Sequence, residues 1–533
     1  METMASTQPP PGTVLLEDLE HDKLVLQPRP SEDPEQPLNW SVLRKTINFS
    51  IVCFYALMAF VILDVGTVVW GPMNEELGIS FTNLSYSFAA NCAGLAVGCF
   101  LLVPLSIKIG RRPVYIISTL ALFLSAIWMA KTYTVGDNIG NNITSGIFGA
   151  ISESIVQMTI ADLFFVHQRA RMNAIYVIMV DIGTFLAPVA AGYCSNSQGW
   201  RWINWWTAIF LGVLLLAMIF AYEETKYTVS VRSTASPVRS QQEMEAVLES
   251  KDKDAKDLRP TISSTESVDP GANPFEKKTV RQRFALVTLT PGGSRSFLAL
   301  IWDFVALLQF PAVAYTALMW GATLTWFSVI LNTLSIYFVA PPYNFTAAGI
   351  GLLNLPPFIG GLIAIVPCAY NDYIIIWLAK RNGGVFEPEM RLWLALLGVV
   401  VGPAGLCLFG LSLAQGMHWI VPCIGSAFYG AGLSIMGTTS LTYLQDSYAE
   451  VIGDALVPVT FVRNALATMV VFALTPWINA MGLYNMFVCA TCLAFALYAL
   501  TIPMLIWGKS WRVQTAAAYA RHIERSGNHA SIS

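Results

Sequence analysis

The chain contains a long series of apolar runs, each about twenty residues long, separated by short polar stretches. A helix of this length spans the hydrocarbon of a bilayer, and inside lipid only helices and closed barrels satisfy every backbone hydrogen bond. Charged residues make up only 12% of the chain, whereas about 25% is typical of soluble domains. These features predict an all-α membrane protein.

The apolar runs fall into two groups of six. The first six predicted spans lie at residues 47–70, 84–107, 114–133, 139–165, 172–194 and 202–222, and the second six at 311–338, 349–370, 392–414, 419–444, 456–478 and 484–507. A repeated group of spans is typical of transporters built from two related halves. We therefore predict twelve transmembrane helices in two pseudo-symmetric six-helix bundles.

Three polar segments flank and separate these groups. Residues 1–45 are rich in proline and acidic residues, residues 223–296 are rich in Ser, Lys and Glu, and residues 508–533 are polar. Such compositions bury too little apolar surface to fold alone. We expect a disordered N-terminal tail (1–45), an N-terminal bundle (46–222), a largely disordered linker (223–296), a C-terminal bundle (297–507) and a C-terminal tail (508–533).

The distribution of basic residues predicts the orientation. The loops expected on one side contain Lys108, Arg111, Arg112, Arg169, Arg171, Lys380, Arg381 and Arg391, and those on the other side contain Lys131 and Arg201. Because Lys and Arg are retained on the cytoplasmic side, we expect both tails and the linker in the cytoplasm. Asn83 and Asn344 begin N-glycosylation acceptor sequences in the predicted outer loops.

One apolar run carries an acidic residue at its centre. In the fourth span, Asn142, Gly146, Gly149, Glu153 and Gln157 share one face of a helix. A carboxylate near the bilayer centre costs about 2.5 kcal/mol or more, so it must face protein, water or a substrate path. We predict that this helix lines a central cavity, that Glu153 binds a proton or substrate, and that Gln157 orients the Glu153 carboxylate or a substrate.

Three other charged residues lie within apolar runs. Asp181 is central in the fifth span and Asp64 is nearer the outer end of the first, so both are further candidates for proton coupling or substrate binding. Pairing with a neighbouring helix, or a wet helix end, is the alternative for each acid. Arg463, early in the eleventh span, is expected to snorkel to the cytoplasmic face.

The turn between the second and third spans carries a short motif. Gly110 permits a tight turn, and Arg111 and Arg112 are expected to hold acidic groups on neighbouring helices, with Asp162 as a candidate partner. Retention of the two arginines on the cytoplasmic side by the charge bias of the loops is the alternative. The motif resembles the end of the loop signature GxLaDRxGRR of the major facilitator superfamily. Ile107 stands where that signature has its Asp.

The fifth span contains a regular set of small residues and a proline. They are Ala174, Gly183, Ala187, Pro188, Ala191 and Gly192. Small residues let helices approach closely, so generic helix packing is one explanation. Their spacing also resembles the antiporter signature of the same superfamily. In drug:proton antiporters of that type, the fourth span has an arginine where this chain has Asn142.

Longer segments narrow the resemblance. Residues 157–169, 185–192, 198–202, 344–357 and 387–393 together resemble a fungal branch of the twelve-span drug:proton antiporter family. That branch includes the yeast histidinol/polyamine transporter group and transporters associated with fungal secondary metabolism. The resemblance implies the major facilitator fold and a proton-driven carrier, with the plasma membrane as its expected location.

The leading functional hypothesis is a proton-coupled exporter of a small organic compound, such as a fungal metabolite or drug. Uptake of a polyamine or another organic cation is the alternative, because a carboxylate binds either a proton or an ammonium group. A membrane sensor that does not transport is a third hypothesis. The sequence contains no nucleotide-binding loop, metal-ligand spacing or nucleic-acid module. We therefore expect no enzyme activity, cofactor, metal or nucleic-acid partner, and a monomer whose partners are substrate, protons and lipid.

Overall fold

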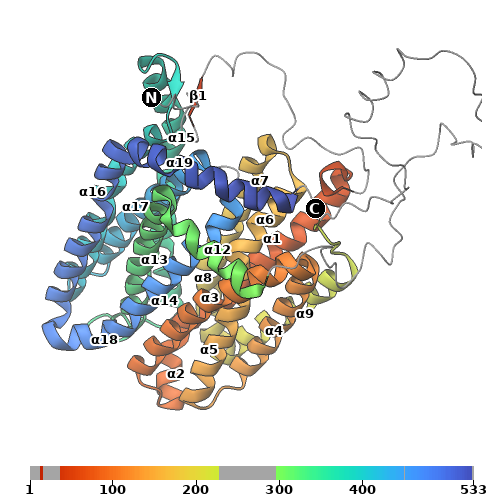
Figure 1. The fold of residues 1–533 in the computed structure, drawn as a ribbon. Coiled ribbons are helices and arrows are strands. Elements are labelled where there is room, and N and C mark those ends of the chain that lie inside the picture. Colours follow the sequence, from red (N-terminus) through yellow and green to blue (C-terminus); the bar gives the residue numbers. More distant parts are fainter. Residues whose placement is uncertain (1–12, 16–35, 227–295, 449–450, 531–533) are drawn as a thin grey trace, which may run out of the picture.

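The computed structural model describes residues 13–15, 36–226, 296–448 and 451–530, so most of the predicted N-terminal tail and linker lies outside the described residues. The described chain is almost entirely helical. Its two short strands, β1 (Val14–Leu15) and β2 (Val385–Phe386), pair antiparallel. Figure 1 shows the red-to-yellow helices of the first half beside the green-to-blue helices of the second half. The predicted all-α architecture is confirmed.

The first half consists of six spans, several of them interrupted. A short 3₁₀ turn, η2 (Pro37–Asn39), precedes them. The elements are α1 (Val42–Asp64), η3 (Val65–Val69), α2 (Trp70–Leu77), α3 (Phe81–Ile109), α4 (Arg111–Ala130), α5 (Val135–Gly149), α6 (Ile151–Leu163), α7 (Val166–Asp181), η4 (Ile182–Leu186), α8 (Ala187–Gln198) and α9 (Trp200–Phe220). Side-chain caps define several helix starts: the Ser80 hydroxyl accepts from the backbone N–H of Asn83, and Thr134 and Asp137 form a reciprocal capping box.

The second half repeats this plan after a short amphipathic helix. Its elements are α12 (Phe297–Ala306), η6 (Leu307–Gln309), α13 (Pro311–Tyr337), α14 (Ala347–Leu352), α15 (Leu355–Arg381), η7 (Pro388–Arg391), α16 (Leu392–Ala414), α17 (Ile420–Ser447), α18 (Ile452–Tyr498) and α19 (Thr501–Ala530). Gly482 inside α18 has φ 80° and ψ 160°, which is not helical. Because glycine adopts this conformation without a Cβ clash, the chain turns there and α18 contributes to two spans.

The prediction of twelve spans is therefore confirmed. The described residues contain 11 helical stretches long and apolar enough to cross a membrane, and the last of them, Ile452–Ile523, includes the turn at Gly482 and so holds two spans. In the second of these spans, the exposed apolar side chains of Ile502 and Ile506 extend the apolar surface into α19.

The fourth span, Val135–Leu163, is helical, with an irregularity of one residue at Ala150 between α5 and α6, where φ is −56° and ψ is −27°. Two expectations about local structure are wrong. Asn83 does not lie in a loop but in the first turn of α3. Residues 223–226, assigned to the linker, pack on the first bundle, where Glu223 pairs with Arg44 at 2.5 Å. By contrast, Asn344 is exposed between α13 and α14.

The two halves approach each other closely at glycine residues of α8 and α14. A Cβ placed on Gly192 of α8 would lie 2.5 Å from the Ala347 carbonyl oxygen, and one on Gly351 of α14 would lie 2.5 Å from the Pro188 carbonyl oxygen. The Asn196 amide also donates to the Thr346 hydroxyl at 3.3 Å. The bundles are therefore in backbone contact near the predicted outer ends of α8 and α14.

Candidate functional site

Glu153 lies beside the irregularity at Ala150 in the fourth span. It is in the first turn of α6, and it is 5% exposed. The Ser152 hydroxyl donates to the Gly149 carbonyl at 2.7 Å, and the Tyr176 hydroxyl of α7 donates to the Ser152 carbonyl at 2.8 Å. This segment lies in the bundle interior, and the Glu153 carboxylate is directed towards the second half.

The Glu153 carboxylate contacts two consecutive residues of α18, in the other bundle. Arg463 donates to its Oε1 in an ion pair, and the Asn464 amide donates to its Oε2 at 2.9 Å. Both carboxylate oxygens are therefore held by groups 310 and 311 residues away. A charge-assisted pair inside the membrane joins the two halves of the molecule.

The expectation that Arg463 snorkels to the cytoplasmic face is wrong. Its guanidinium carbon lies 5.2 Å from the ring centroid of Trp320 on α13, and the Trp320 indole donates to the Gly437 carbonyl at 3.0 Å. Within the described chain, the buried Nε of Arg463 and the buried Oδ1 of Asn464 have no hydrogen-bond partner. The pair therefore retains free donor and acceptor capacity.

The other two predicted acids, Asp64 and Asp181, differ in their relation to the Glu153–Arg463 pair. Asp64, at the end of α1, hydrogen-bonds the side chain of Thr184 and interacts electrostatically with Glu153 and Arg463. Arg463 forms its ion pair with Glu153, and Asp64 adds a second acid near that pair. Asp181 ends α7 directly before the π-helical turn η4, a type of irregularity frequent at functional sites.

Gln157 does not join the Glu153 contacts. It is half-buried one turn further along α6, and no described residue hydrogen-bonds its side chain. Asn142, which was expected on the same face as Glu153, lies in α5 and donates to the Asn138 carbonyl at 2.9 Å. Among the described contacts, neither Gln157 nor Asn142 hydrogen-bonds the Glu153 carboxylate.

The basic turn after α3 forms a second polar cluster. Gly110 has φ 110°, and a Cβ there would lie 2.3 Å from a carboxylate oxygen of Glu224. The Glu224 carboxylate accepts from the backbone N–H groups of Arg111 and Arg112 at 3.0 and 3.1 Å. A carboxylate at this position satisfies amides at the start of α4 and complements its dipole. The structure also places Arg111 Nε 3.4 Å from Asp162 Oδ2.

The buried side chain of Arg112 ties the start of α4 to the end of α9. It donates to the Tyr222 carbonyl at 2.8 Å and to the Ile219 carbonyl at 2.7 Å. Nearby, Lys226 donates to the Ile107 carbonyl at 2.6 Å. Burial, with a contribution from Arg111, lowers the pKa of Lys226 to about 8. This cluster joins the second, third, fourth and sixth spans at one membrane face.

The small residues of the fifth span do not share one partner. A Cβ on Gly183 would lie 2.8 Å from the Leu57 carbonyl oxygen, so Gly183 packs against α1 inside its own bundle. Gly192 and the Pro188 carbonyl instead contact α14 of the other bundle. The spacing that suggested an antiporter signature thus provides close backbone contacts on two sides of the helix.

Sequence reasoning missed Asn464, Trp320 and Glu224. The sequence did contain a signal for Glu224. It is one of two acids directly after the sixth span, on the side of the basic turn, where an acid is an electrostatic partner for arginine. The signal for Asn464 is weaker, and consists only of its position after an arginine within an apolar run. Nothing in the sequence indicates that Trp320 lies beside Arg463.

Comparison with known proteins identifies the family. The sequence model of the Major Facilitator Superfamily matches residues 47–469, which span both bundles around the Glu153–Arg463 pair. The chain belongs to the major facilitator superfamily. It is therefore a membrane transporter rather than an enzyme, as the sequence predicted.

Relatives within the superfamily match over nearly the whole chain. An uncharacterised transporter of Schizosaccharomyces pombe is 33% identical over 93% of this chain and 89% of its own length. Protein HOL1 of Saccharomyces cerevisiae is 27% identical over 94% and 92%, and the transporter cpaT of Aspergillus oryzae is 27% identical over 83% and 82%. A solved structure of a D-xylose–proton symporter has a TM-score of 0.57 at 15% identity, covering 86% of this chain and 97% of that one. The last likeness concerns the major facilitator fold alone.

Proposed function

We propose that this protein is a proton-coupled secondary transporter that exports a small organic compound by alternating access, with Glu153 as the coupling acid. The observation that carries the proposal is the contact of Glu153 with Arg463 and Asn464 across the two bundles. An ionised carboxylate attracts Arg463, whereas a protonated one does not carry the charge that holds the pair. Binding and release of a proton at Glu153 would therefore alter the contact between the bundles.

Asp64 and Asp181 extend this proposal. Asp64 interacts with both members of the pair, so protonation of either acid changes the charge that Arg463 must balance. Asp181, beside the π-helical turn of the fifth span, is a second site where a proton or a substrate group would bind. Gln157, one turn beyond Glu153, is proposed to contact the substrate.

Uptake of a polyamine or another organic cation is the second candidate. The specific support is the presence of two acids near Arg463: Glu153 pairs with it, and Asp64 interacts with it electrostatically. A substrate ammonium group would replace Arg463 at one of the carboxylates. Export and uptake thus use the same residues and differ in which ligand displaces the arginine.

We also propose a monomer in the plasma membrane, with both termini and the linker in the cytoplasm. The support is the bias of Lys and Arg in the short loops. The proposed boundaries of the two bundles remain near 46–222 and 297–507, except that residues 223–226 belong with the first bundle. Asn344, exposed between α13 and α14, is the better placed glycosylation acceptor.

The test is transport in cells that lack their own drug and polyamine carriers. Accumulation of labelled spermidine and of fluorescent organic compounds is compared between wild type, Glu153→Gln and empty vector, each with and without a protonophore. Lower retention of an organic compound, reversed by the protonophore, supports export. Protonophore-sensitive accumulation of spermidine supports uptake.

Glu75→Gln is the matched control, because Glu75 is an exposed acid at the end of the first span. It should behave as wild type, whereas Glu153→Gln should lose at least about 90% of the protonophore-sensitive flux, since coupling needs a titrating group. Flux that survives in Glu153→Gln, with equal protein in the membrane, would contradict the role of Glu153.

A further inference from the structure

The interior of the first bundle contains a second polar region, separate from the Glu153–Arg463 pair. Asn138, Asn141, Asn142 and Ser145 share one face of α5, because 141 and 142 lie three and four residues after 138, and 145 lies four and three residues after them. The first two are 2% and 3% exposed. Burying an amide without a hydrogen bond costs roughly 1–3 kcal/mol in proteins, so every polar atom on this face requires a partner.

Protein groups provide only part of these partners. The Asn138 amide donates to the Ser87 hydroxyl at 3.0 Å, and the Asn142 amide donates to the Asn138 side-chain oxygen at 3.0 Å. The Ser125 hydroxyl donates to the Asn141 side-chain oxygen at 2.5 Å. The Asn141 amide nitrogen itself donates to no group in the described parts of the chain.

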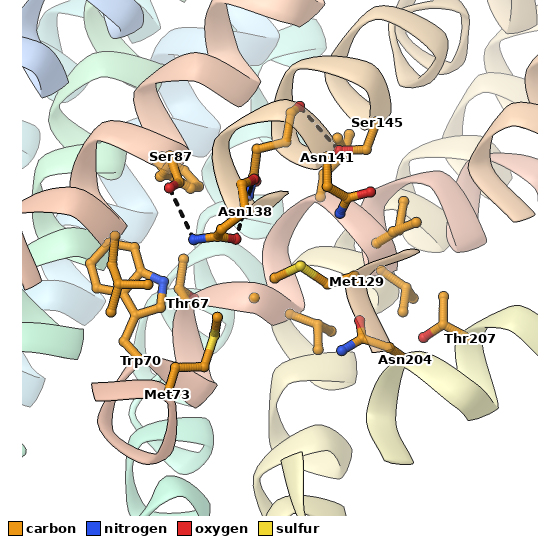
Figure 2. Close-up of a pocket in the computed structure, with 18 residues that line it drawn as sticks. Thr67, Trp70, Met73, Ser87, Met129, Asn138, Asn141, Ser145, Asn204 and Thr207 are labelled. Carbon is orange, nitrogen blue, oxygen red and sulfur yellow. Dashed lines mark hydrogen bonds between the residues drawn. The ribbon is translucent and has the colours of Figure 1, made fainter. Parts of the chain in front are cut away.

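That amide faces a cavity. Figure 2 shows Asn141 of α5 and Asn204 of α9 directed into the same space, with Met129 beside them. The Asn204 side chain, too, has no hydrogen-bond partner among the described residues. The cavity volume is about 30 Å³, and one water requires roughly 10–15 Å³ on this measure. The space therefore suits about two water molecules and is too small for an organic substrate.

The cavity also borders the interruption of the first span. Gly66, in the 3₁₀ segment η3, lines the cavity with its backbone atoms, because glycine has no side chain. The Thr67 hydroxyl, also in the lining, donates to the Asp64 carbonyl at 3.0 Å. Where a membrane helix is interrupted, ordered water is one means of satisfying the released backbone groups. The unpartnered amides and the interrupted helix therefore face one small cavity.

We propose that this cavity is a binding site for water, holding about two molecules between the amides of Asn141 and Asn204 and the backbone of η3. The water supplies the hydrogen bonds that the protein does not, and it supports the interruption of the first span next to Asp64. The inference does not depend on the transported substrate or on the direction of transport.

Hydroxyl-radical labelling by X-ray radiolysis tests it on the full-length protein in detergent. Radicals formed from bound water oxidise the side chains beside that water, including buried ones. Met73 and Met129 line the cavity and are 0% and 8% exposed. Met486, 0% exposed in the apolar core of the second bundle, is the matched control. Oxidation at each methionine is followed by mass spectrometry.

We expect Met73 and Met129 to be oxidised at least about tenfold faster than Met486, because water must be within contact distance. Equal rates for the three methionines would overturn the proposal, and this comparison needs no variant. In the Asn141→Leu and Asn204→Leu variants, the rates at Met73 and Met129 should fall towards that of Met486. Unchanged rates in both folded variants would also overturn it.

Discussion

Glu153 and Arg463 hold opposite charges in a medium that solvates neither well. Removing one partner of a buried ion pair leaves the other uncompensated, which costs about 3–5 kcal/mol. We expect Arg463→Leu to lower the free energy of unfolding by that amount, because Glu153 is 5% exposed. Thermal or denaturant unfolding in detergent measures the loss.

The same pair predicts strong coupling between the two substitutions. In the double variant Arg463→Leu with Glu153→Gln, both charges of the pair are removed together, so much of the lost stability should return. Glu75→Gln, at an exposed position, should stay within about 0.5 kcal/mol of wild type. Additive losses from Arg463→Leu and Glu153→Gln would mean that the two side chains do not interact in solution.

At the scale of elements, the Glu224 carboxylate determines how α4 begins. It accepts two backbone N–H groups, at Arg111 and Arg112. Replacing such a group at a helix N-terminus costs about 0.5–2 kcal/mol. We expect Glu224→Gln to lower the free energy of unfolding by roughly 1 kcal/mol, because the amide keeps one acceptor oxygen but loses the charge.

Gly110→Ala should be more damaging than Glu224→Gln. The alanine would have to adopt φ 110° and would place its Cβ 2.3 Å from a Glu224 carboxylate oxygen. Gly453→Ala is the control, since a Cβ at Gly453 meets no atom within 4 Å. Among the three variants, Gly453→Ala should have the highest melting temperature, Glu224→Gln an intermediate one and Gly110→Ala the lowest. A melting temperature for Gly110→Ala equal to that of Gly453→Ala would contradict this account.

At the scale of the whole molecule, the two bundles meet through backbone at α8 and α14. Since a Cβ on Gly192 or Gly351 would lie 2.5 Å from a carbonyl oxygen of the other bundle, Gly192→Ala and Gly351→Ala should force the bundles apart there. We expect Cys194, half-buried on α8, to react at least about threefold faster with a membrane-impermeant maleimide, because opening exposes buried thiols.

The reagent is added from the predicted outer side, to intact cells. Gly453→Ala again serves as the control, because it changes the same residue type in open space. If all three variants label at the wild-type rate, the contact between α8 and α14 does not restrict access from that side.

The sequence by itself determined the membrane class, the twelve spans and the residues worth attention within them. The length and apolarity of a span are local properties, and so is the cost of placing Glu153 inside one. For the same reason the basic turn around Arg111 was recognisable, together with the small residues of the fifth span. The family resemblance rested on those local motifs, and the match to residues 47–469 bears it out.

Only the tertiary structure decided how those residues are used. Arg463 was expected at the cytoplasmic face, yet it pairs with Glu153, because a partner 310 residues away compensates its charge better than lipid or a long reach to water. The Tyr176 hydroxyl of α7 donates to the Ser152 carbonyl beside Ala150, and residues of α5 and α9 line the cavity beside η3. The hydrophobicity of a span is determined by its own residues. A buried charge or a carbonyl without a helical partner is instead stabilised by the helices that pack beside it.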